Sequence, residues 1–167
     1  FERAEVDAEG FDALFAAEAE ALGHALEGAA VIACLAGDVR PYMVNALDRL
    51  KAEGFGIGCI TNNVKAGRGA AMARSEDKAL QVESIMARFD HVIESSKAGV
   101  RKPDPRIYQM MCEALSVSPE TCIYLDDLGI NCKPAATLGM HAIKVTSGEQ
   151  ALADLEVLDH AIDAGDD

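Results

Sequence analysis

The stretch IYLDDLGIN at residues 123–131 decides the fold, because an apolar run typical of a buried strand passes directly into two adjacent carboxylates, Asp126 and Asp127. At a separation of ~4 Å and an effective dielectric constant of about 20, two such charges repel by about 4 kcal/mol. A strand that ends in this way needs a compensating positive charge. We therefore expect a cation and a basic side chain beside this pair.

Similar apolar runs recur along the chain, and helical patterns separate them. Strands are predicted at 55–60, 91–95, 122–125 and 141–145, and helices at 7–22, 28–36, 41–53, 78–88, 105–115, 131–138 and 148–158. Strands that alternate with helices indicate a parallel sheet covered on both faces. The predicted fold is an α/β, three-layer, doubly wound parallel sheet of Rossmann-like type.

Helix boundaries are predicted from capping residues. Asp7 is a suitable N-cap for the first helix, and Asp104 for the helix that opens with Pro105. The expected buried face of that second helix consists of Ile107, Met110, Met111, Ala114 and Leu115. The segment 64–77 is predicted to be a loop, and its Gly-Arg-Gly is not a phosphate-binding P-loop because no Gly-Lys-Ser/Thr follows.

Composition limits the classes of partner. The chain has 167 residues, of which 50% are hydrophobic, which suits one domain with a sizeable core. Its net charge of -13 disfavours binding to nucleic acid or to anionic membranes. The most apolar run, at 28–37, is too short to span a bilayer, and no basic leader precedes an apolar segment. We expect a soluble, cytoplasmic domain, and its oligomeric state stays open.

The cysteines and histidines do not indicate a metal site. The number of cysteines, five, is odd, and none forms a Cys-x-x-Cys pair, so free thiols in a reducing compartment are predicted. The four histidines are scattered, and the chain has no His-Glu-x-x-His motif.

Polar residues follow three of the predicted strands. In order along the chain they are Thr61, Asn62 and Asn63, then Ser95, Ser96 and Lys102, then Asp126 and Asp127. The ligand site of an open parallel sheet lies beyond the carboxyl ends of its strands. We therefore expect hydroxyl, amide, ammonium and carboxylate groups to converge at one rim of the sheet.

This set of groups suits chemistry on an anion with a divalent cation. A carboxylate such as Asp127 is a ligand that Mg²⁺ prefers, and Lys102 is placed to neutralise charge on a phosphoryl group. Each residue also has an ordinary structural explanation in a turn or a loop. That explanation suits Asn63, Ser95 and Ser96 at least as well, whereas Thr61, Lys102 and the Asp pair together favour a functional site.

These motifs resemble the haloacid dehalogenase-like hydrolases, and within them the phosphatase domain at the amino end of soluble epoxide hydrolases. The resemblance rests on CITNN at 59–63, IESSKAGVRKPDPRIY at 93–108 and YLDDLGINCKPAATLGM at 124–140. The segment EVDAEGFDALFAAEAEALG at 5–23 resembles the later part of the family's helical cap. The resemblance implies a partial helical cap at 1–37 and a hydrolase core at 38–167.

The resemblance also implies an activity. It predicts a Mg²⁺-dependent hydrolase of a small-molecule phosphate ester, in which Thr61 and Asn62 hold the phosphate. Lys102 would steady the nucleophile and bind phosphate, Asp127 would contact the metal, and Asp126, a catalytic-site residue, would face Lys102. The Asp pair favours a phosphatase over the metal-free dehalogenases of the family.

One motif of the family has no counterpart in this sequence. An Asp-x-Asp on the first strand supplies the nucleophile and the general acid, and no Asp-x-Asp occurs before Thr61. That strand would be the central one of the sheet. We therefore expect an amino-terminally truncated, inactive fragment whose nucleophile lies upstream of Phe1. The alternative is a non-catalytic domain that keeps the fold for binding or assembly.

Overall fold

The computed structural model describes residues 6–34, 38–62 and 76–163. Asn63 and nearly all of the predicted loop at 64–77 lie outside the described residues. The chain divides into two compact units, of which the first ends at Arg101 and the second begins at Lys102. The expected division into a cap at 1–37 and a core at 38–167 stays a prediction.

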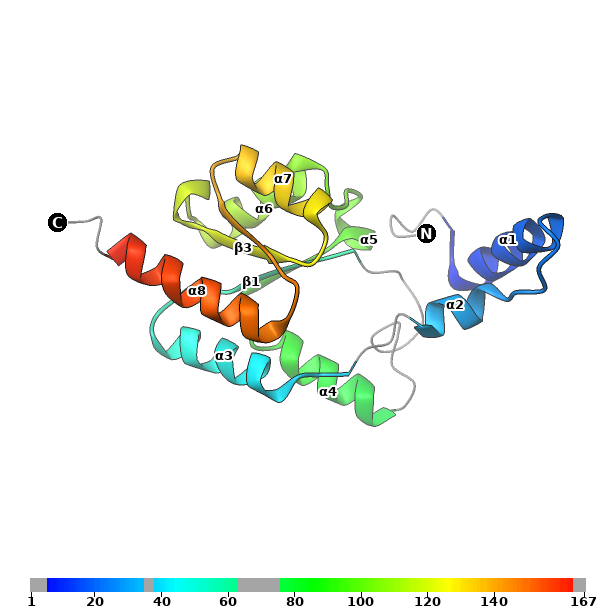
Figure 1. The fold of residues 1–167 in the computed structure, drawn as a ribbon, viewed down its shortest axis with the longest axis horizontal. Helices are drawn as coiled ribbons and strands as arrows, with labels where there is room; N and C mark the ends of the chain where they lie inside the picture. Colours follow the sequence, from blue (N-terminus) through cyan, green and yellow to red (C-terminus); the bar gives the residue numbers. More distant parts are fainter. Residues whose placement is uncertain (1–5, 35–37, 63–75, 164–167) are drawn as a thin grey trace. The chain divides into compact units, whose positions relative to one another are not determined.

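The first unit contains helices and two strands in its described part (Figure 1). In chain order these are α1 (Ala8–Ala21), α2 (Gly28–Cys34), α3 (Pro41–Ala52), β1 (Gly58–Thr61), α4 (Glu76–Met86), β2 (His91–Glu94) and α5 (Ser95–Ala98). The predicted helices are confirmed with small shifts at their ends. The short helix α5 was not predicted, because four residues are too few for a helical period to show.

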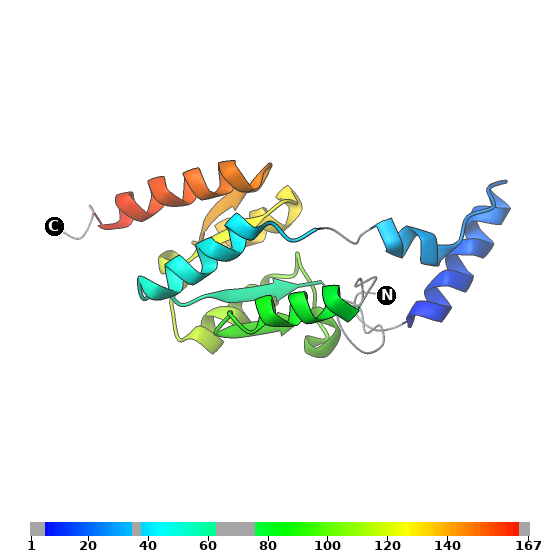
Figure 2. The ribbon, with the colours of Figure 1, turned by 90° about the horizontal axis from the view of Figure 1, so that it is seen from below.

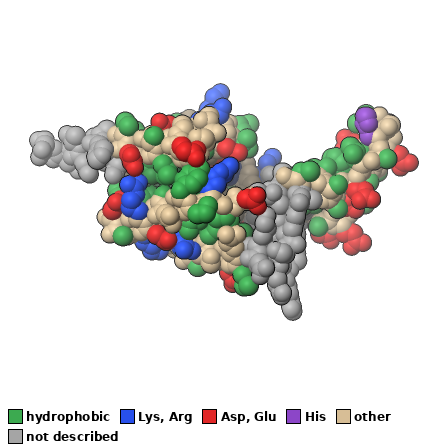
Figure 3. Space-filling model, turned by 60° about the horizontal axis from the view of Figure 1, so that its bottom comes forward, with side chains coloured by type: hydrophobic (Ala, Val, Ile, Leu, Met, Phe, Trp, Pro, Cys, Tyr) green, Lys and Arg blue, Asp and Glu red, His purple; other side chains and the backbone are tan. Residues whose placement is uncertain are grey.

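Helices α1 and α2 pack as a pair, and an aspartate side chain accepts a backbone hydrogen bond at the start of each. Asp7 accepts a hydrogen bond of 2.8 Å from the amide of Gly10, which confirms the predicted N-cap of α1. Asp12, within α1, accepts one of 2.7 Å from the amide of Ala29, at the start of α2. A Cβ on Gly28 would lie 2.7 Å from the Cα of Asp12, so glycine permits this close approach. Figure 3 shows acidic and hydrophobic side chains together on the surface of this pair.

Strands β1 and β2 pair in parallel, with Gly58 opposite His91 and Thr61 opposite Glu94 (Figure 2). The predicted strand began at Phe55, whereas β1 begins at Gly58. The strand does not extend to Ile57, the residue before Gly58, because the amide of Ile57 donates to the side chain of Asp90 at 2.9 Å and not to a neighbouring strand.

The second unit contains the remaining elements. They are α6 (Pro105–Leu115), a 3₁₀ turn (Pro119–Thr121), β3 (Ile123–Asp126), α7 (Gly129–Thr137), β4 (His141–Lys144) and α8 (Gly148–Asp163). Strands β3 and β4 pair in parallel from Ile123 opposite His141 to Asp126 opposite Lys144. Helix α7 contacts both strands and α8 contacts β4. In Figure 1, α7 lies above and α8 below this strand pair.

The buried face of α6 differs from the predicted one. Ile107 and Met111 are buried as expected, but Met110 is 37% exposed and Tyr108 is fully buried. Tyr108 takes an interior position because its hydroxyl donates to the backbone carbonyl of Asn131 at 2.8 Å, which satisfies the buried polar group. The face is therefore rotated towards Tyr108 and Cys112.

Strand β3 is less buried than its apolar sequence suggested. Ile123, Tyr124 and Leu125 are only partly buried, while Asp126, the last residue of the strand, is 7% exposed. Among the described strands, β3 pairs with β4 and β1 with β2, in two parallel pairs. The family's first strand, which was expected to be missing, is not one of these four strands.

No helix within the described ranges is long and apolar enough to cross a membrane.

Candidate functional site

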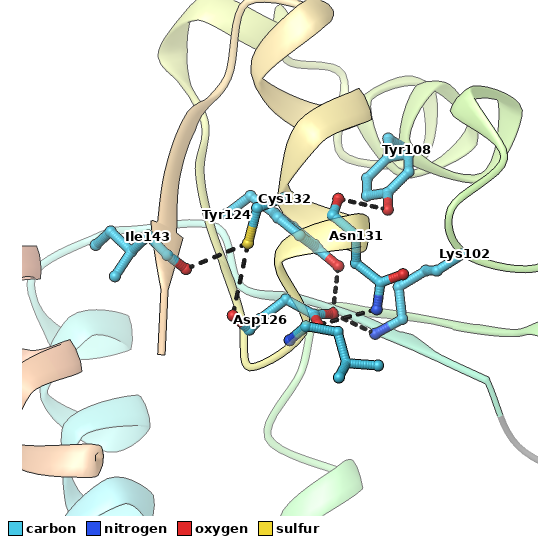
Figure 4. A network of polar contacts seen from close by, with 8 residues as sticks. Lys102, Tyr108, Tyr124, Asp126, Asn131, Cys132 and Ile143 are labelled. Atoms are coloured by element: carbon cyan, nitrogen blue, oxygen red, sulfur yellow. Dashed lines mark hydrogen bonds and ion pairs between the residues drawn. The ribbon is translucent and has the colours of Figure 1, made fainter. Parts of the chain in front are cut away.

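The carboxylate of Asp126 is the centre of a polar network at the end of β3 (Figure 4). Its Oδ2 atom accepts hydrogen bonds from Lys102 Nζ and from the Tyr124 hydroxyl, both at 2.7 Å. Its Oδ1 atom accepts from the amide of Leu128 and from Asn131 Nδ2, both at 2.9 Å. A carboxylate has about four lone-pair sites, so this side chain is fully satisfied by protein groups.

These donors keep Asp126 ionised inside the protein. Burial is the largest influence on its pKa and acts to raise it. Lys102, Tyr124, Asn131 and the amide of Leu128 together outweigh burial, so the pKa of Asp126 lies below its usual value of 3.8. A negative charge is therefore stable at this position.

Lys102 forms an ion pair with Asp126 and is largely buried. The side chains of Lys102 and Asp126 are 15% and 4% exposed. The chain beyond Lys102 is anchored by Asp104, which accepts a 3.0 Å hydrogen bond from the amide of Arg106 and thus confirms the predicted cap of α6. Arg106 also donates to the Asp104 carboxylate through its side chain, at 2.6 Å.

Two tyrosines support the network, and sequence reasoning assigned no role to either. Their rings meet edge to face with centroids 5.1 Å apart. Burial raises the pKa of Tyr108 to about 12, and burial together with the neighbouring Asp126 raises the pKa of Tyr124 further. Both hydroxyls therefore stay protonated and act as donors. Tyr124 was detectable, since it precedes Asp126 by two residues on a strand and so shares its face.

The Asp pair divides into one inward and one outward carboxylate. Asp126 is buried, whereas Asp127, just beyond the strand, is exposed. The predicted contact with Lys102 is present, so the buried member has its compensating charge. Because Asp126 is occupied by four donors, Asp127 is the member of the pair that could serve as a metal ligand, and this role stays a prediction.

The described residues provide only part of a Mg²⁺ site. A carboxylate oxygen such as that of Asp127 is a ligand of the kind Mg²⁺ prefers, with further positions filled by water, substrate and other carboxylates. Across the three described ranges, no three side chains of His, Cys, Asp or Glu come together as a metal-binding group. Asp127 therefore fits as a single ligand.

The other predicted site residues lie in the first unit. Thr61 ends β1 and Asn62 follows it, and both are partly exposed. Ser95 and Ser96 are buried at the start of α5. Lys102, Asp126 and Asp127 belong to the second unit, so the convergence of Thr61 and Asn62 with them stays a prediction.

Three curated proteins illustrate the sequence similarity. The chain is 40% identical over 118 residues to acyl-CoA dehydrogenase family member 10 of Mus musculus. This match covers 71% of the chain and 10% of that protein. It is 37% identical to bifunctional epoxide hydrolase 2 of Sus scrofa, over 68% of the chain and 20% of that protein. It is 34% identical to Phosphatase MT3486 of Mycobacterium tuberculosis (strain CDC 1551 / Oshkosh), over 68% of the chain and 47% of that protein.

The chain thus spans less than half the length of these curated relatives.

Solved structures confirm the predicted fold class. A predicted HAD-like family hydrolase from Porphyromonas gingivalis matches with a TM-score of 0.66 at 20% identity, over 94% of this chain and 75% of that one. A HAD family enzyme from Bacteroides thetaiotaomicron, solved as a magnesium complex, matches with a TM-score of 0.60 at 19% identity, over 88% of this chain and 73% of that one. At such identities the likeness concerns the fold, which is the Rossmann-like α/β fold.

The family model of the haloacid dehalogenase-like hydrolases matches residues 2–139, which include the Lys102–Asp126 pair and Asp127. This match covers most of the chain. The chain belongs to the haloacid dehalogenase-like hydrolases.

Proposed function

We propose that this chain carries the phosphate-binding and metal-binding half of a Mg²⁺-dependent phosphomonoester hydrolase. The observation that carries the proposal is the 2.7 Å contact of Lys102 with a buried Asp126, beside an exposed Asp127. The ammonium group of Lys102 is held in place by Asp126, and the exposed carboxylate of Asp127 would be available to a metal ion. Support also comes from the relatives, which include a mycobacterial phosphatase, and from the neighbouring structure that was solved with magnesium.

Lys102 has the central role in this proposal. An ammonium group held in a partly dry site stabilises negative charge that develops on a transferring phosphoryl group. Asp126 fixes that ammonium and acts through it, since its own oxygens are occupied by protein donors. Asp126 is thus a positioning residue in this scheme.

The remaining roles fall on Thr61, Asn62 and Asp127. The Thr61 hydroxyl and groups of Asn62 would donate to phosphoryl oxygens of a small phosphate ester. Asp127 would hold Mg²⁺, which when bound offsets phosphate charge and orients the ester. The substrate class follows from these groups, which recognise the phosphoryl end of the ester.

The nucleophile is the part that the described residues do not supply. Phosphoryl transfer in this scheme needs a carboxylate in line with the leaving oxygen, and Asp126 is occupied by its donors. Thr61 has no neighbouring base in the sequence to activate it. We therefore place the nucleophile in an Asp-x-Asp segment upstream of Phe1 and expect the chain as printed to be inactive.

The test compares the printed chain with a chain extended upstream through the preceding encoded residues. Both are assayed with para-nitrophenyl phosphate and Mg²⁺. The extended chain should turn over substrate, and Lys102→Ala within it should reduce turnover by about 10²–10³-fold. Lys97→Ala is the matched control, because that lysine side chain is 73% exposed.

Equal turnover by the printed and extended chains would refute the upstream nucleophile. Full activity of Lys102→Ala would remove Lys102 from the mechanism. If the extended chain lacks an Asp-x-Asp and is inactive, the alternative of a non-catalytic binding domain is favoured instead.

A further inference from the structure

The Oδ2 atom of Asp126 has two donors at the same distance. Lys102 Nζ and the Tyr124 hydroxyl each lie 2.7 Å from it. Lys102 reaches this atom from the segment before α6, whereas Tyr124 lies on β3 itself (Figure 4). One donor is at the end of a flexible four-carbon chain, and the other is on a rigid ring that is fixed to the same strand as its acceptor.

Packing alone does not account for the Tyr124 hydroxyl. The ring meets Tyr108 edge to face at 5.1 Å, and a phenylalanine ring would keep that contact. The hydroxyl is distinguished by its polar contact with Asp126, which is 7% exposed.

The two oxygens of Asp126 are held in different ways. Oδ1 is fixed by the amide of Leu128 and by Asn131, which both follow the strand. Oδ2 is fixed by Lys102 and Tyr124. Without the Tyr124 hydroxyl, Oδ2 would accept from Lys102 and not from the strand, and the position of this oxygen would then depend on the flexible side chain that it is meant to hold.

We propose that Tyr124 is a positioning residue that acts through Asp126 to fix the ammonium group of Lys102. The hydroxyl holds Oδ2 in place, so that Lys102 meets a fixed acceptor and is itself ordered. The importance of Lys102 rests on the proposed function, but the positioning itself is a property of the second unit.

Tyr124→Phe tests this role, and Tyr108→Phe is the matched control. Both variants lose one phenolic hydroxyl from the same ring pair. The Tyr108 hydroxyl donates to the backbone carbonyl of Asn131, whereas the Tyr124 hydroxyl donates to Asp126. General loosening of the ring pair should therefore affect both variants, and loss of positioning only Tyr124→Phe.

The readout is the side-chain ammonium signal of Lys102 in ¹H–¹⁵N NMR spectra, assigned by its absence in Lys102→Met. An ammonium held in a buried ion pair exchanges its protons slowly and gives a visible signal. We expect the signal to weaken several-fold in Tyr124→Phe and to persist in Tyr108→Phe. Tyr124→4-aminophenylalanine, which keeps a donor on the ring, should restore it.

An unchanged signal in Tyr124→Phe would overturn the proposal, as would equal loss in both phenylalanine variants. The readout requires no turnover, so it separates this proposal from the proposed function. A weakened Lys102 signal in Tyr124→Phe, together with an extended chain that does not hydrolyse phosphate esters, would support the positioning role and refute the hydrolase. An intact signal in an active extended chain would do the reverse.

Discussion

At the scale of single residues, Asp126 holds a negative charge within the protein because each of its oxygens accepts two hydrogen bonds. Asn would keep the shape of the side chain but not this bonding. A carboxamide has one acceptor oxygen, and its NH₂ group would face donors where Asp126 has an oxygen. The position therefore requires a carboxylate.

Asp126→Asn should lower the free energy of unfolding by about 3–5 kcal/mol, the range found when one partner is removed from a buried ion pair. Equilibrium urea unfolding measures this loss. Asp48→Asn is the control, because it breaks an ion pair of 2.8 Å with Arg88 in which the Asp48 side chain is 54% exposed. That change should cost about 0–1 kcal/mol. Losses of equal size in both variants would contradict the special position of Asp126.

Asp104 makes a pH-dependent contribution to stability. Its pKa is lowered from 3.8 to about 2, mainly by the side chain of Arg106 and then by the Arg106 amide. A carboxylate with a lowered pKa in the folded state stabilises the fold above its usual pKa, and this contribution is lost as the pH falls through the folded-state pKa.

Asp104→Asn should therefore have a lower urea midpoint than the parent chain at neutral pH. The difference should shrink as the pH falls from 3.8 towards 2. Asn still accepts the cap hydrogen bond, so Asp104→Ala should be less stable than Asp104→Asn at neutral pH. A parent-to-Asn difference that stays constant with pH would show that the charge of Asp104 does not matter.

The sequence predicted some of these residue contacts and not others. The caps by Asp7 and Asp104 are confirmed, because a cap depends on residues within one turn of the helix. The contact of Asp126 with Lys102 was expected from the family motifs, and it is present at 2.7 Å. The role of Tyr124 was missed. Its place two residues before Asp126 puts it on the same face of the strand, but the sequence does not show that its hydroxyl donates to the buried carboxylate.

At the scale of elements, the crossing of α1 and α2 depends on the absence of a side chain at Gly28. A Cβ there would lie 2.7 Å from the backbone Cα of Asp12 and 3.1 Å from the Cβ of Phe15. Backbone cannot move away as the tip of a flexible side chain can. The two helices would have to separate to admit even one methyl group.

Gly28→Ala should accordingly destabilise the α1–α2 pair by about 1–3 kcal/mol, the usual cost of overpacking. The measurement is hydrogen exchange at the amide of Ala29, which donates to Asp12 in the parent chain. Gly56→Ala is the control, since nothing lies within 4 Å of a Cβ built there. Exchange at Ala29 that is as slow in Gly28→Ala as in the control would mean that the crossing tolerates the methyl group.

The helix faces show where element-level prediction ends. The 3.6-residue period located α6 correctly, but its buried face is turned towards Tyr108 and Cys112 and away from Met110. Hydrophobicity ranks methionine above tyrosine for an interior position. The carbonyl of Asn131 reverses that order by accepting from the Tyr108 hydroxyl, and it lies 23 residues away in the sequence.

At the scale of the whole molecule, none of the five cysteines is in a disulfide, in agreement with the prediction from their odd number and an expected reducing compartment. Their surroundings differ. Cys34 is exposed, Cys112 is buried, and burial is the main reason that the pKa of Cys122 is raised to about 11. Thiolate is the reactive form, so a raised pKa slows reaction.

Titration with a disulfide reagent under denaturing, non-reducing conditions should detect five thiols. In the native protein, Cys34 should react first and Cys112 and Cys122 slowly. Cys34→Ser should remove the fastest phase. Retention of that phase in Cys34→Ser would show that another cysteine is the accessible one.

The α/β fold was predictable because short apolar runs and helical periodicity in the sequence reveal the alternation of strands and helices. The parallel pairing of β1 with β2 and of β3 with β4 follows from that alternation. Whether Thr61 lies near Lys102 cannot be predicted from such local patterns, because the two residues belong to different units. Their convergence stays a prediction, as does the boundary between cap and core at residue 37.

The ion pair of Lys102 with Asp126 lies wholly on the carboxyl side of Arg101. This matters for recombination between related chains. A crossover before Lys102 delivers both partners from one parent, together with Tyr124 and Asn131. A crossover between Lys102 and Asp126 joins Lys102 from one parent to Asp126 and its donors Leu128 and Asn131 from another. Chimeras joined at residue 101 should thus keep a matched pair, whereas junctions inside 103–125 bring together partners that were selected apart.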